Sequence, residues 1–480
     1  MPRHNRRFRA VKTSPPRYEE DVIGLPSSAM VLTNSDRRTA WCQRRWFYAE
    51  GLGLSSGASG PMYFGSCVHA AMENAFRYWM VADAPMPNDW LTTPVGYVDA
   101  CLHCGDRHHP NNDSNKQESC IVCEGTGLGP YATALQYMKG AFEPDEWATE
   151  TARLHDVIFG YFQRYGAGPM TDFKVVAVEL AVAIPILSPK SGKVYRSTVP
   201  IIQEPAESHA FGRFKKWRVA RAGQRETATN VSFPWYQCGR LDAVLQHRRT
   251  GELWVHEFKT SANPVSYGRD LQLDTQIPGY MRALNRASQL GCFGSDKPKV
   301  AGYQWDVLGS RKHTKPRVLK SGKVSLSKGQ KIASWHWEAF LNDIGPETYT
   351  DSELEELKAK TIQLRETVDS TLYHREFGTF SPELDQRYAV ELFTEARRFA
   401  NMRRMAVAID PFDESEIGQH FPRTPVCRIQ GHGCAFKGPC LHDSQEARNS
   451  FEERSPIVWM TRSFIGNQPQ KEEKEIVCPF

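Results

Sequence analysis

Two consecutive apolar segments that contain charged residues constrain the fold of this chain more than any other feature. The stretch YQCGRLDAVLQHRRTGELWVHEFKTSA (236–262) has the pattern of two strands around a turn at 249–251. Asp242, Glu257 and Lys259 stand in these strands among leucine, valine, tryptophan and phenylalanine. Because an unpaired charge is costly to bury, we interpret the three residues as parts of a site. The alternative is a solvated strand edge, where the same residue types occur by chance.

Strands and helices around this pair indicate an α/β fold. The β-branched run at 173–186 and the segment VAGYQWDVLG at 300–309 predict two more strands. Elements of both kinds in alternation are typical of a sheet covered by helices. Helices are expected at about 132–165, 270–287, 352–374 and 381–408.

The residue types in the strand pair suit phosphodiester hydrolysis. Glu257 and Lys259 are two positions apart on one strand, so they project from the same face of the sheet. Two carboxylates can hold Mg²⁺ together with water and phosphate oxygens. The metal polarises the phosphate and lowers the pKa of a bound water, and the ammonium neutralises developing negative charge.

Four cysteines between the predicted helices have the spacing of a zinc site. Cys101 and Cys104 form one C-x2-C pair, and Cys120 and Cys123 form the second. Each pair directs two sulfurs at one ion, and the loop between them completes a tetrahedral site. We expect Zn²⁺ in a zinc-ribbon insertion at 101–127, which either grips DNA or a partner, or only stabilises the insertion.

The motifs before and after the strand pair make the chain resemble a known family. GRLDAVL followed by ELWVHEFKT is similar to the core of the PD-(D/E)XK nucleases, in particular the RecB-like branch that includes Cas4-like and AddB-like exonucleases. That branch has a histidine on an upstream helix, matched by His69 in GSCVHAAMENAF. It also has a Gln-x-x-x-Tyr helix, matched by Gln276 and Tyr280. Leu241 stands where the classical pattern has proline, as is common in this branch.

The resemblance implies a fold and a set of roles. It implies a restriction-endonuclease-like central mixed sheet flanked by helices, with a C-terminal helical, cysteine-bearing cap. His69, Asp242 and Glu257 are then ligands of Mg²⁺ or Mn²⁺, and Lys259 is catalytic. Gln276 and Tyr280 are then the residues that position DNA. Structural alternatives are a core histidine at 69 and helix packing at 280. Glu179 is a candidate to support the site, but we leave it out, since a single glutamate in a strand is more often structural.

A second set of cysteines lies far apart in the sequence. Cys42 precedes the histidine helix, and Cys427, Cys434 and Cys440 follow the core. The resemblance to Cas4-like and AddB-like nucleases implies that these four bind a [4Fe–4S] cluster that joins the chain ends. The gap between Cys427 and Cys434 is longer than in that pattern, so His432 remains an alternative ligand and zinc an alternative metal.

Composition excludes several classes of protein and divides the chain. The 480 residues contain no run of eighteen apolar residues and no apolar signal segment near the start, so we expect a cytoplasmic protein without membrane spans. The net charge of +5 concentrates in the first residues, 211–225 and 310–331, which we interpret as DNA-facing strips. The expected divisions are a flexible basic arm (1–30), N-terminal nuclease helices (31–100), the zinc insertion (101–127), the nuclease core (128–310) with an extension (190–233), a basic loop (311–331), C-terminal helices with cluster cysteines (332–445) and a tail (446–480).

The sequence therefore predicts a metal-dependent DNA exonuclease that acts on single strands or DNA ends. The strand and basic loop at 300–331 resemble phage-encoded members of the branch, which implies a role in phage DNA recombination, repair or replication in the host cytoplasm. No GxxxxGK[ST] motif occurs, so a helicase or recombinase would be a separate partner. Two alternatives are a structure-specific endonuclease of the same fold and a non-catalytic DNA-binding or assembly factor.

Overall fold

A single long strand, β8 (Thr229–His247), organises the sheet of this computed structural model. Its 19 residues are enough to pair with several neighbours along its length. It pairs antiparallel with β3 (Phe173–Pro185), β4 (Arg196–Gln203) and β9 (Leu253–Ser261), and parallel with β1 (Met30–Leu32). The structure describes residues 29–55, 60–83, 101, 120, 122–123, 126, 128–138, 144–165, 172–203, 207–209, 212–214, 217–270, 274–310, 317–320, 323–325, 349–357, 359, 372–424, 434, 436–441, 448 and 451–453.

The remaining strands make the sheet mixed. β9 pairs parallel with β10 (Val300–Gly309), and β10 pairs antiparallel with β13 (Tyr373–Thr379). At the other end, β4 pairs antiparallel with β7 (Trp217–Val219). The order of the eight-stranded sheet is β13-β10-β9-β8-β4-β7, with β1 and β3 also on β8. A mixed sheet flanked by helices confirms the expected α/β fold class.

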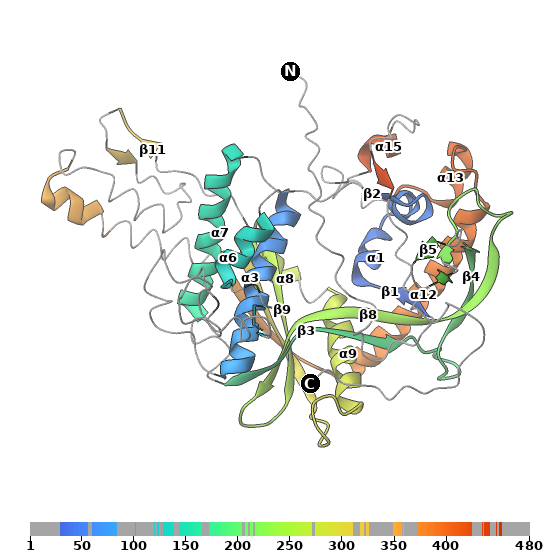
Figure 1. The fold of residues 1–480 in the computed structure, drawn as a ribbon, viewed down its shortest axis with the longest axis horizontal. Coiled ribbons are helices and arrows are strands. Elements are labelled where there is room, and N and C mark those ends of the chain that lie inside the picture. Colours follow the sequence, from blue (N-terminus) through green and yellow to red (C-terminus); the bar gives the residue numbers. More distant parts are fainter. Residues whose placement is uncertain are drawn as a thin grey trace.

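Helices bury two hydrophobic clusters against this sheet (Figure 1). One cluster joins α3 (Gly60–Ala82), α6 (Pro130–Met138) and α7 (Pro144–Tyr165) to side chains of β8 and β9. The other joins α9 (Gln276–Gln289) and α12 (Pro382–Ala408) to the sheet. The aromatic rings of Trp79, Tyr161, Trp305 and Tyr388 are fully or almost fully buried in these clusters. Strand β9 therefore lies between two helical layers, which fixes the position of its charged residues.

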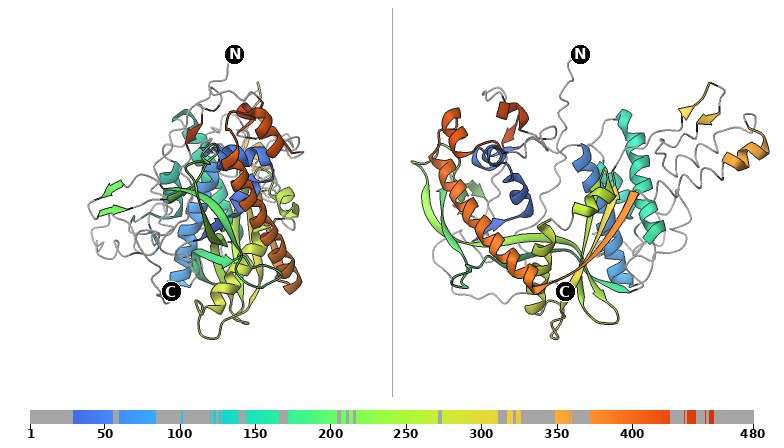
Figure 2. Two further views of the ribbon diagram at one scale, coloured as in Figure 1. Left: turned by 90° about the vertical axis from the view of Figure 1, so that its right-hand side faces the viewer. Right: turned by 180° about the vertical axis from the view of Figure 1, so that it is seen from behind.

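An N-terminal segment and a C-terminal segment of the described chain lie side by side (Figure 2). β2 (Leu54–Ser55) pairs with β14 (Glu452–Glu453). The π-helical turn Phe47–Gly51 packs near α13 (Glu414–His420), since Phe47 stacks on Phe421 with ring centroids 4.8 Å apart. The hydroxyl of Tyr48 donates a 2.9 Å hydrogen bond to the carbonyl of Pro439 in α15 (Lys437–Leu441). The N-terminal and C-terminal parts of the described chain are thus in contact.

The structure corrects the expected helix at 352–374. Residues 351–357 are helical, but Tyr373 and His374 begin β13 at the edge of the sheet. The sequence of β13, YHREFGT, pairs with β10 over seven residues. This long-range pairing overrides the local helical pattern. The expected helix at 270–287 is shifted as well, since α8 (Pro264–Asp270) precedes the start of α9 at Gln276.

The expected insertions and strips are described only in part. The extension at 190–233 contributes β4 and β7 to the sheet, and β5 (Glu207–His209) pairs with β6 (Gly212–Phe214) in a separate two-stranded sheet. Within the basic loop, β11 (Arg317–Val318) pairs with β12 (Val324–Ser325). The basic arm up to residue 28 and the tail beyond residue 453 lie outside the described residues.

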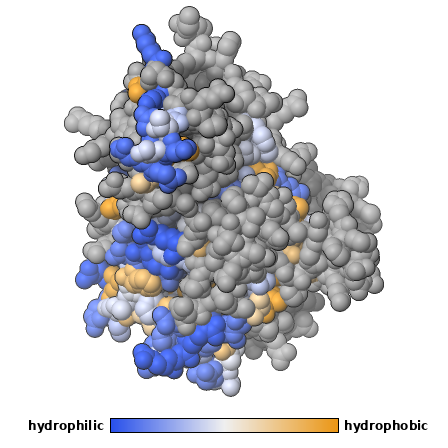
Figure 3. All heavy atoms as spheres, turned by 90° about the vertical axis from the view of Figure 1, so that its left-hand side faces the viewer, coloured by the Kyte–Doolittle hydropathy of each residue, from blue (hydrophilic) through white to orange (hydrophobic). Residues whose placement is uncertain are grey.

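The described surface is mixed in character. On the face in Figure 3, hydrophilic residues cover most of the described area and hydrophobic residues form small separate patches. No helix among the described residues is long and apolar enough to cross a membrane.

Candidate active site

The strand pair separates at the point where its charged residues stand. Pairing between β8 and β9 runs from Gln246 and Leu253 to Ala243 and His256 and does not continue to Asp242. The amide of Phe258 instead donates a 2.7 Å hydrogen bond to Oδ2 of Asp242. The backbone hydrogen bond that the ladder loses is thus replaced by one to a side chain. This places the Asp242 carboxylate against the strand that contains Glu257 and Lys259.

Glu257 lies at the centre of the site. Its side chain is 1% exposed, and its Oε1 atom pairs with the ammonium of Lys259. Nε2 of Gln276 donates a 2.6 Å hydrogen bond to the same oxygen and also lies 2.8 Å from the hydroxyl of Tyr280. The other oxygen, Oε2, is buried with no hydrogen-bond partner among the described residues. Such an atom is costly unless a ligand or an ion satisfies it.

α3 and α9 bring the other predicted residues to the point where the pairing of β8 and β9 stops. Nδ1 of His69 on α3 lies 3.6 Å from Oδ1 of Asp242, and the two side chains are 32% and 13% exposed. On α9, Gln276 and Tyr280 are one turn apart and lie on the same face of the helix. Gly239 of β8 admits the Tyr280 ring, since a Cβ at this position would overlap it. All six residues of the predicted nuclease site therefore meet in one place.

The charged groups of the site shift one another's pKa values. Burial and then Asp242 raise the pKa of Glu257 to about 7. Burial would raise the pKa of Asp242, but His69 and Lys259 outweigh it and lower that pKa. Burial would lower the pKa of Lys259, but Glu257 and Asp242 outweigh it and raise that pKa. The lysine is therefore held as an ammonium beside two carboxyl groups that repel each other.

Glu179 of β3 also lies beside the site, although the sequence interpretation treated it as structural. Its neighbours Val178 and Leu180 pair with Ala243 and Leu241, so Glu179 stands opposite Asp242. Its φ of 55° is in the left-handed region, which is unusual for a strand residue with a side chain. Burial, followed by Asp242, raises its pKa to about 8. A third carboxyl group thus belongs to the same cluster, and only the register between β3 and β8 shows it.

The geometry matches the comparison with known families. A family model described as the PD-(D/E)XK nuclease superfamily matches residues 37–440. The chain belongs to this superfamily. No curated protein matches it significantly. Membership implies a phosphodiesterase that acts on DNA with a divalent metal, and the finer roles of the individual residues stay predictions.

The residues of this PD-(D/E)XK site fit a hard divalent cation. Carboxylate oxygens are the ligands that Mg²⁺ and Mn²⁺ prefer. The buried Oε2 of Glu257 lacks a partner among the described residues, and Glu257 and Asp242 destabilise each other's charged forms. A cation between the two carboxyl groups would give Oε2 of Glu257 a partner and would relieve the repulsion between Glu257 and Asp242. The ligand atoms of His69, Asp242 and Glu257 do not all lie within 4.8 Å of one another in the described part of the chain.

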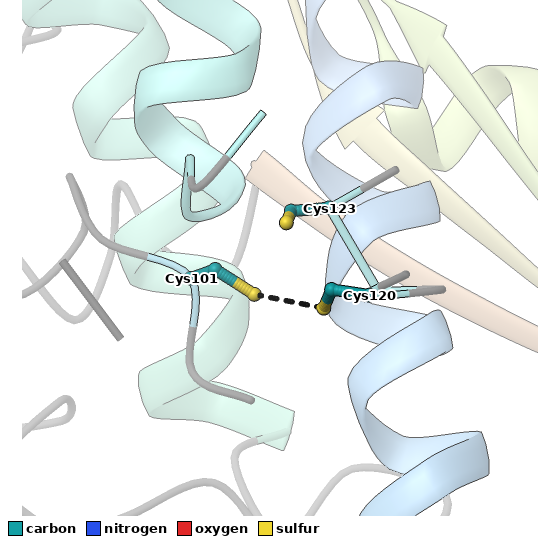
Figure 4. A group of neighbouring side chains, drawn as sticks. All are labelled: Cys101, Cys120 and Cys123. Atoms are coloured by element: carbon teal, nitrogen blue, oxygen red, sulfur yellow. Dashed lines mark hydrogen bonds between the residues drawn. The ribbon is translucent and has the colours of Figure 1, made fainter. Parts of the chain in front are cut away.

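Cysteines of the predicted zinc insertion form a separate cluster. The sulfurs of Cys101, Cys120 and Cys123 all lie within 4.8 Å of one another, and all three residues are buried (Figure 4). Cys101 Sγ and Cys120 Sγ are 3.8 Å apart. The three thiols can hold a metal ion, and the fourth predicted ligand, Cys104, lies outside the described residues.

The cluster packs on the helix that contains His69. Tyr78 and Val81 of α3 contact the buried cysteines. Nδ2 of Asn74, also on α3, donates a 3.1 Å hydrogen bond to the carbonyl of Leu128, just beyond the insertion. The cysteine cluster and the residue just beyond the insertion therefore both contact the C-terminal half of α3.

The second predicted cysteine set is described in part. Cys42 is buried, and Cys434 and Cys440 are half-buried beside the core that contains the chain ends. Burial raises the pKa of Cys434, and Cys42 and Cys440 are near enough to act on it electrostatically. The three sulfurs do not meet the 4.8 Å spacing found for the first cluster, judged on the residues that the structure describes. Cys427 and His432 lie outside those residues, so the cluster stays a prediction.

Proposed function

We propose that this nuclease is a metal-dependent DNA exonuclease of the RecB-like, Cas4-like type, which hydrolyses phosphodiester bonds at DNA ends. The observation that supports it best is that six predicted residues meet where the pairing between β8 and β9 stops, namely His69, Asp242, Glu257, Lys259, Gln276 and Tyr280. The exonuclease mode, the preference for single strands and a role in phage recombination, repair or replication beside a helicase or recombinase come from the sequence resemblance.

Each residue has a role that its contacts suit. His69, Asp242 and Glu257 would hold Mg²⁺ or Mn²⁺, with Oε2 of Glu257 as an available oxygen. When bound, the ion supplies polarisation of the phosphate and a more acidic water. Lys259 holds a proton beside Glu257 and neutralises charge that develops on the phosphate. Gln276 fixes the Glu257 carboxylate through its 2.6 Å hydrogen bond and, with Tyr280, orients the DNA strand.

Two further cofactors belong to this proposal. We assign Zn²⁺ to Cys101, Cys104, Cys120 and Cys123, since three of these residues are buried with their sulfurs within 4.8 Å of one another. We assign a [4Fe–4S] cluster to Cys42, Cys427, Cys434 and Cys440, supported by the packing of the chain ends around three of them. Both are structural in this proposal and take no part in hydrolysis.

A labelled-end time course tests the function. Single- and double-stranded DNA with 5′ or 3′ labels is incubated with the protein and Mg²⁺ or Mn²⁺. Progressive shortening from an end is expected, and it should disappear without divalent metal. Discrete products of internal cleavage would indicate an endonuclease of the same fold instead of an exonuclease. Binding without any cleavage by the intact protein would contradict catalysis altogether.

A further inference from the structure

A short helix near the start of the described chain, α1 (Asn34–Thr39), also lies beside the active site. The helix begins with a capping box in which Thr33 and Asp36 exchange hydrogen bonds. This reciprocal pairing fixes the start and the direction of the helix. Arg37 is buried, and its Nη1 atom donates a 2.7 Å hydrogen bond to the hydroxyl of Tyr388 on α12. The same guanidinium pairs with Glu395, so α1 is held firmly against α12.

α1 is held against α9 as well. Nη1 of Arg37 lies 3.4 Å from the carbonyl of Thr275, the residue that precedes α9. Gln237 of β8 donates a 2.6 Å hydrogen bond to the Tyr388 hydroxyl that Arg37 contacts. The residue after Arg37 is therefore placed beside the first turn of α9, where Gln276 begins the helix.

That next residue, Arg38, is exposed and faces the catalytic cluster. Its Nη2 atom donates a 3.1 Å hydrogen bond to Oε1 of Gln276, whose Nε2 in turn contacts Glu257. It also acts electrostatically on Tyr267, which interacts with Lys259 in the same way. Arg38 forms no ion pair with a carboxylate of the described residues. An exposed cation is thus kept at the edge of a site that is rich in carboxyl groups.

We propose that Arg38 is a further substrate-binding residue, whose guanidinium contacts a phosphate of the DNA strand next to the bond that is cleaved. This inference rests on the proposed nuclease function and names the part of the substrate that Arg38 binds. A guanidinium has five donors in a planar fork that matches phosphate oxygens, and Gln276 uses one of them. The cation also offsets the repulsion between the DNA backbone and the carboxylates of the site.

Three variants of the full chain separate this role from general charge loss. Arg38→Ala removes the contact, and Arg38→Lys keeps the charge without the fork. Arg249→Ala is the matched control, because Arg249 is exposed in the turn between β8 and β9. It lies beyond the end of β8 at His247, whereas Asp242 lies within the strand. Thermal melts of the three variants show whether the fold is intact.

Two measurements are made on each variant. Binding of a labelled single-stranded oligonucleotide is followed at several salt concentrations without added divalent metal, and hydrolysis kinetics are followed with Mn²⁺. We expect Arg38→Ala to weaken binding by about 10- to 100-fold, the loss of one charged hydrogen-bonded contact. The slope of log affinity against log salt should fall by about 0.7, for one phosphate on a single strand. Arg38→Lys should recover that slope. In the hydrolysis kinetics of Arg38→Ala, KM should rise by a larger factor than kcat falls.

The outcomes divide clearly. Arg38→Ala binding DNA as tightly as Arg249→Ala would overturn the proposal. So would a fall in kcat with an unchanged affinity and salt slope, since Arg38 would then only position Gln276. Absence of hydrolysis by the unaltered protein would contradict the proposed function instead, and the binding comparison would still test Arg38.

Discussion

Lys259 is the side chain whose removal tests the active site most directly. It pairs with the buried Glu257, and Asp242 and Glu257 hold its pKa above the usual range. We expect Lys259→Ala to lower kcat by at least about 100-fold, because a positioned charge at the phosphate is lost. DNA affinity should change little by comparison. Initial rates with end-labelled DNA and Mn²⁺ measure the effect.

The control for this variant is Lys174→Ala, which removes an exposed lysine at the start of β3. Its rate should match that of the unaltered protein. A double variant, Lys259→Ala with Asp242→Ala, that still cleaves DNA would refute the assigned site.

Glu179 is the residue that tests whether the site extends to β3. Its carboxyl group stands opposite Asp242, and its 2.8 Å contact with Arg240 orients it. We expect Glu179→Gln to raise the Mn²⁺ concentration for half-maximal activity by about tenfold, the usual effect of losing a group that supports metal ligands. Glu391→Gln, on the exposed face of α12, is the control. An unchanged Mn²⁺ requirement would show that Glu179 is structural.

The sequence shows some of these residues and hides others for physical reasons. Glu257 and Lys259 share a face of the sheet because side chains of a strand alternate between its two faces. Gln276 and Tyr280 share a face of their helix because a helix repeats every 3.6 residues. Both relations are local and can be predicted from spacing. Glu179 reaches Asp242 only through the long-range register of β3 on β8. Within its own segment it is a single strand glutamate, a type that is more often structural.

At the scale of elements, a buried ion pair joins β10, the neighbour of β9, to the edge strand β13. Asp306 of β10 stands directly opposite Arg375 of β13, and its oxygens lie 2.6 and 2.7 Å from the guanidinium. The hydroxyl of Tyr161 on α7 donates a 2.7 Å hydrogen bond to the same carboxylate, which is 1% exposed. This pairing also explains why 373–379 is a strand. The local helical pattern contains no sign of a partner so distant in sequence.

Asp306→Asn should destabilise the sheet, because Arg375 would keep its charge and lose its carboxylate. We expect a loss of about 3–5 kcal/mol in the free energy of unfolding. Burial would raise the pKa of Asp306, but Arg375 outweighs it and lowers that pKa below the unfolded value. The stabilisation is therefore fully present above about pH 4 and declines as the pH falls through the lower, folded pKa.

Denaturant titrations from pH 7 to pH 3 check both parts of this prediction. The difference between the unaltered protein and Asp306→Asn should stay constant down to about pH 5 and shrink below pH 4. Asp296→Asn, which alters an exposed loop carboxylate, should show no such difference. A difference that grew as the pH fell would contradict the ion pair as the source.

At the scale of the whole molecule, the N-terminal and C-terminal parts of the described chain are in contact near Cys42, Cys434 and Cys440. The hydroxyl of Thr424 donates a 3.1 Å hydrogen bond to the carbonyl of Trp41, next to Cys42. Phe436, between Cys434 and Cys440, stacks on Tyr48 with ring centroids 5.9 Å apart. The segment that contains Cys42 follows α1 directly, so the same packing also holds Arg38 at the active site. A metal centre here would therefore stabilise the ends of the chain and the edge of the site together.

Metal content in two cysteine variants tests both proposed centres at once. Protein purified without oxygen should be brown, with a broad visible absorbance, and should contain iron and zinc. Cys42→Ser should lose the iron and keep the zinc, while Cys101→Ser should lose the zinc and keep the iron, because the two sets occupy different parts of the fold. A colourless protein with two zinc ions per chain would replace the cluster with a second zinc site, and a protein with neither metal would leave the chain ends held by packing alone.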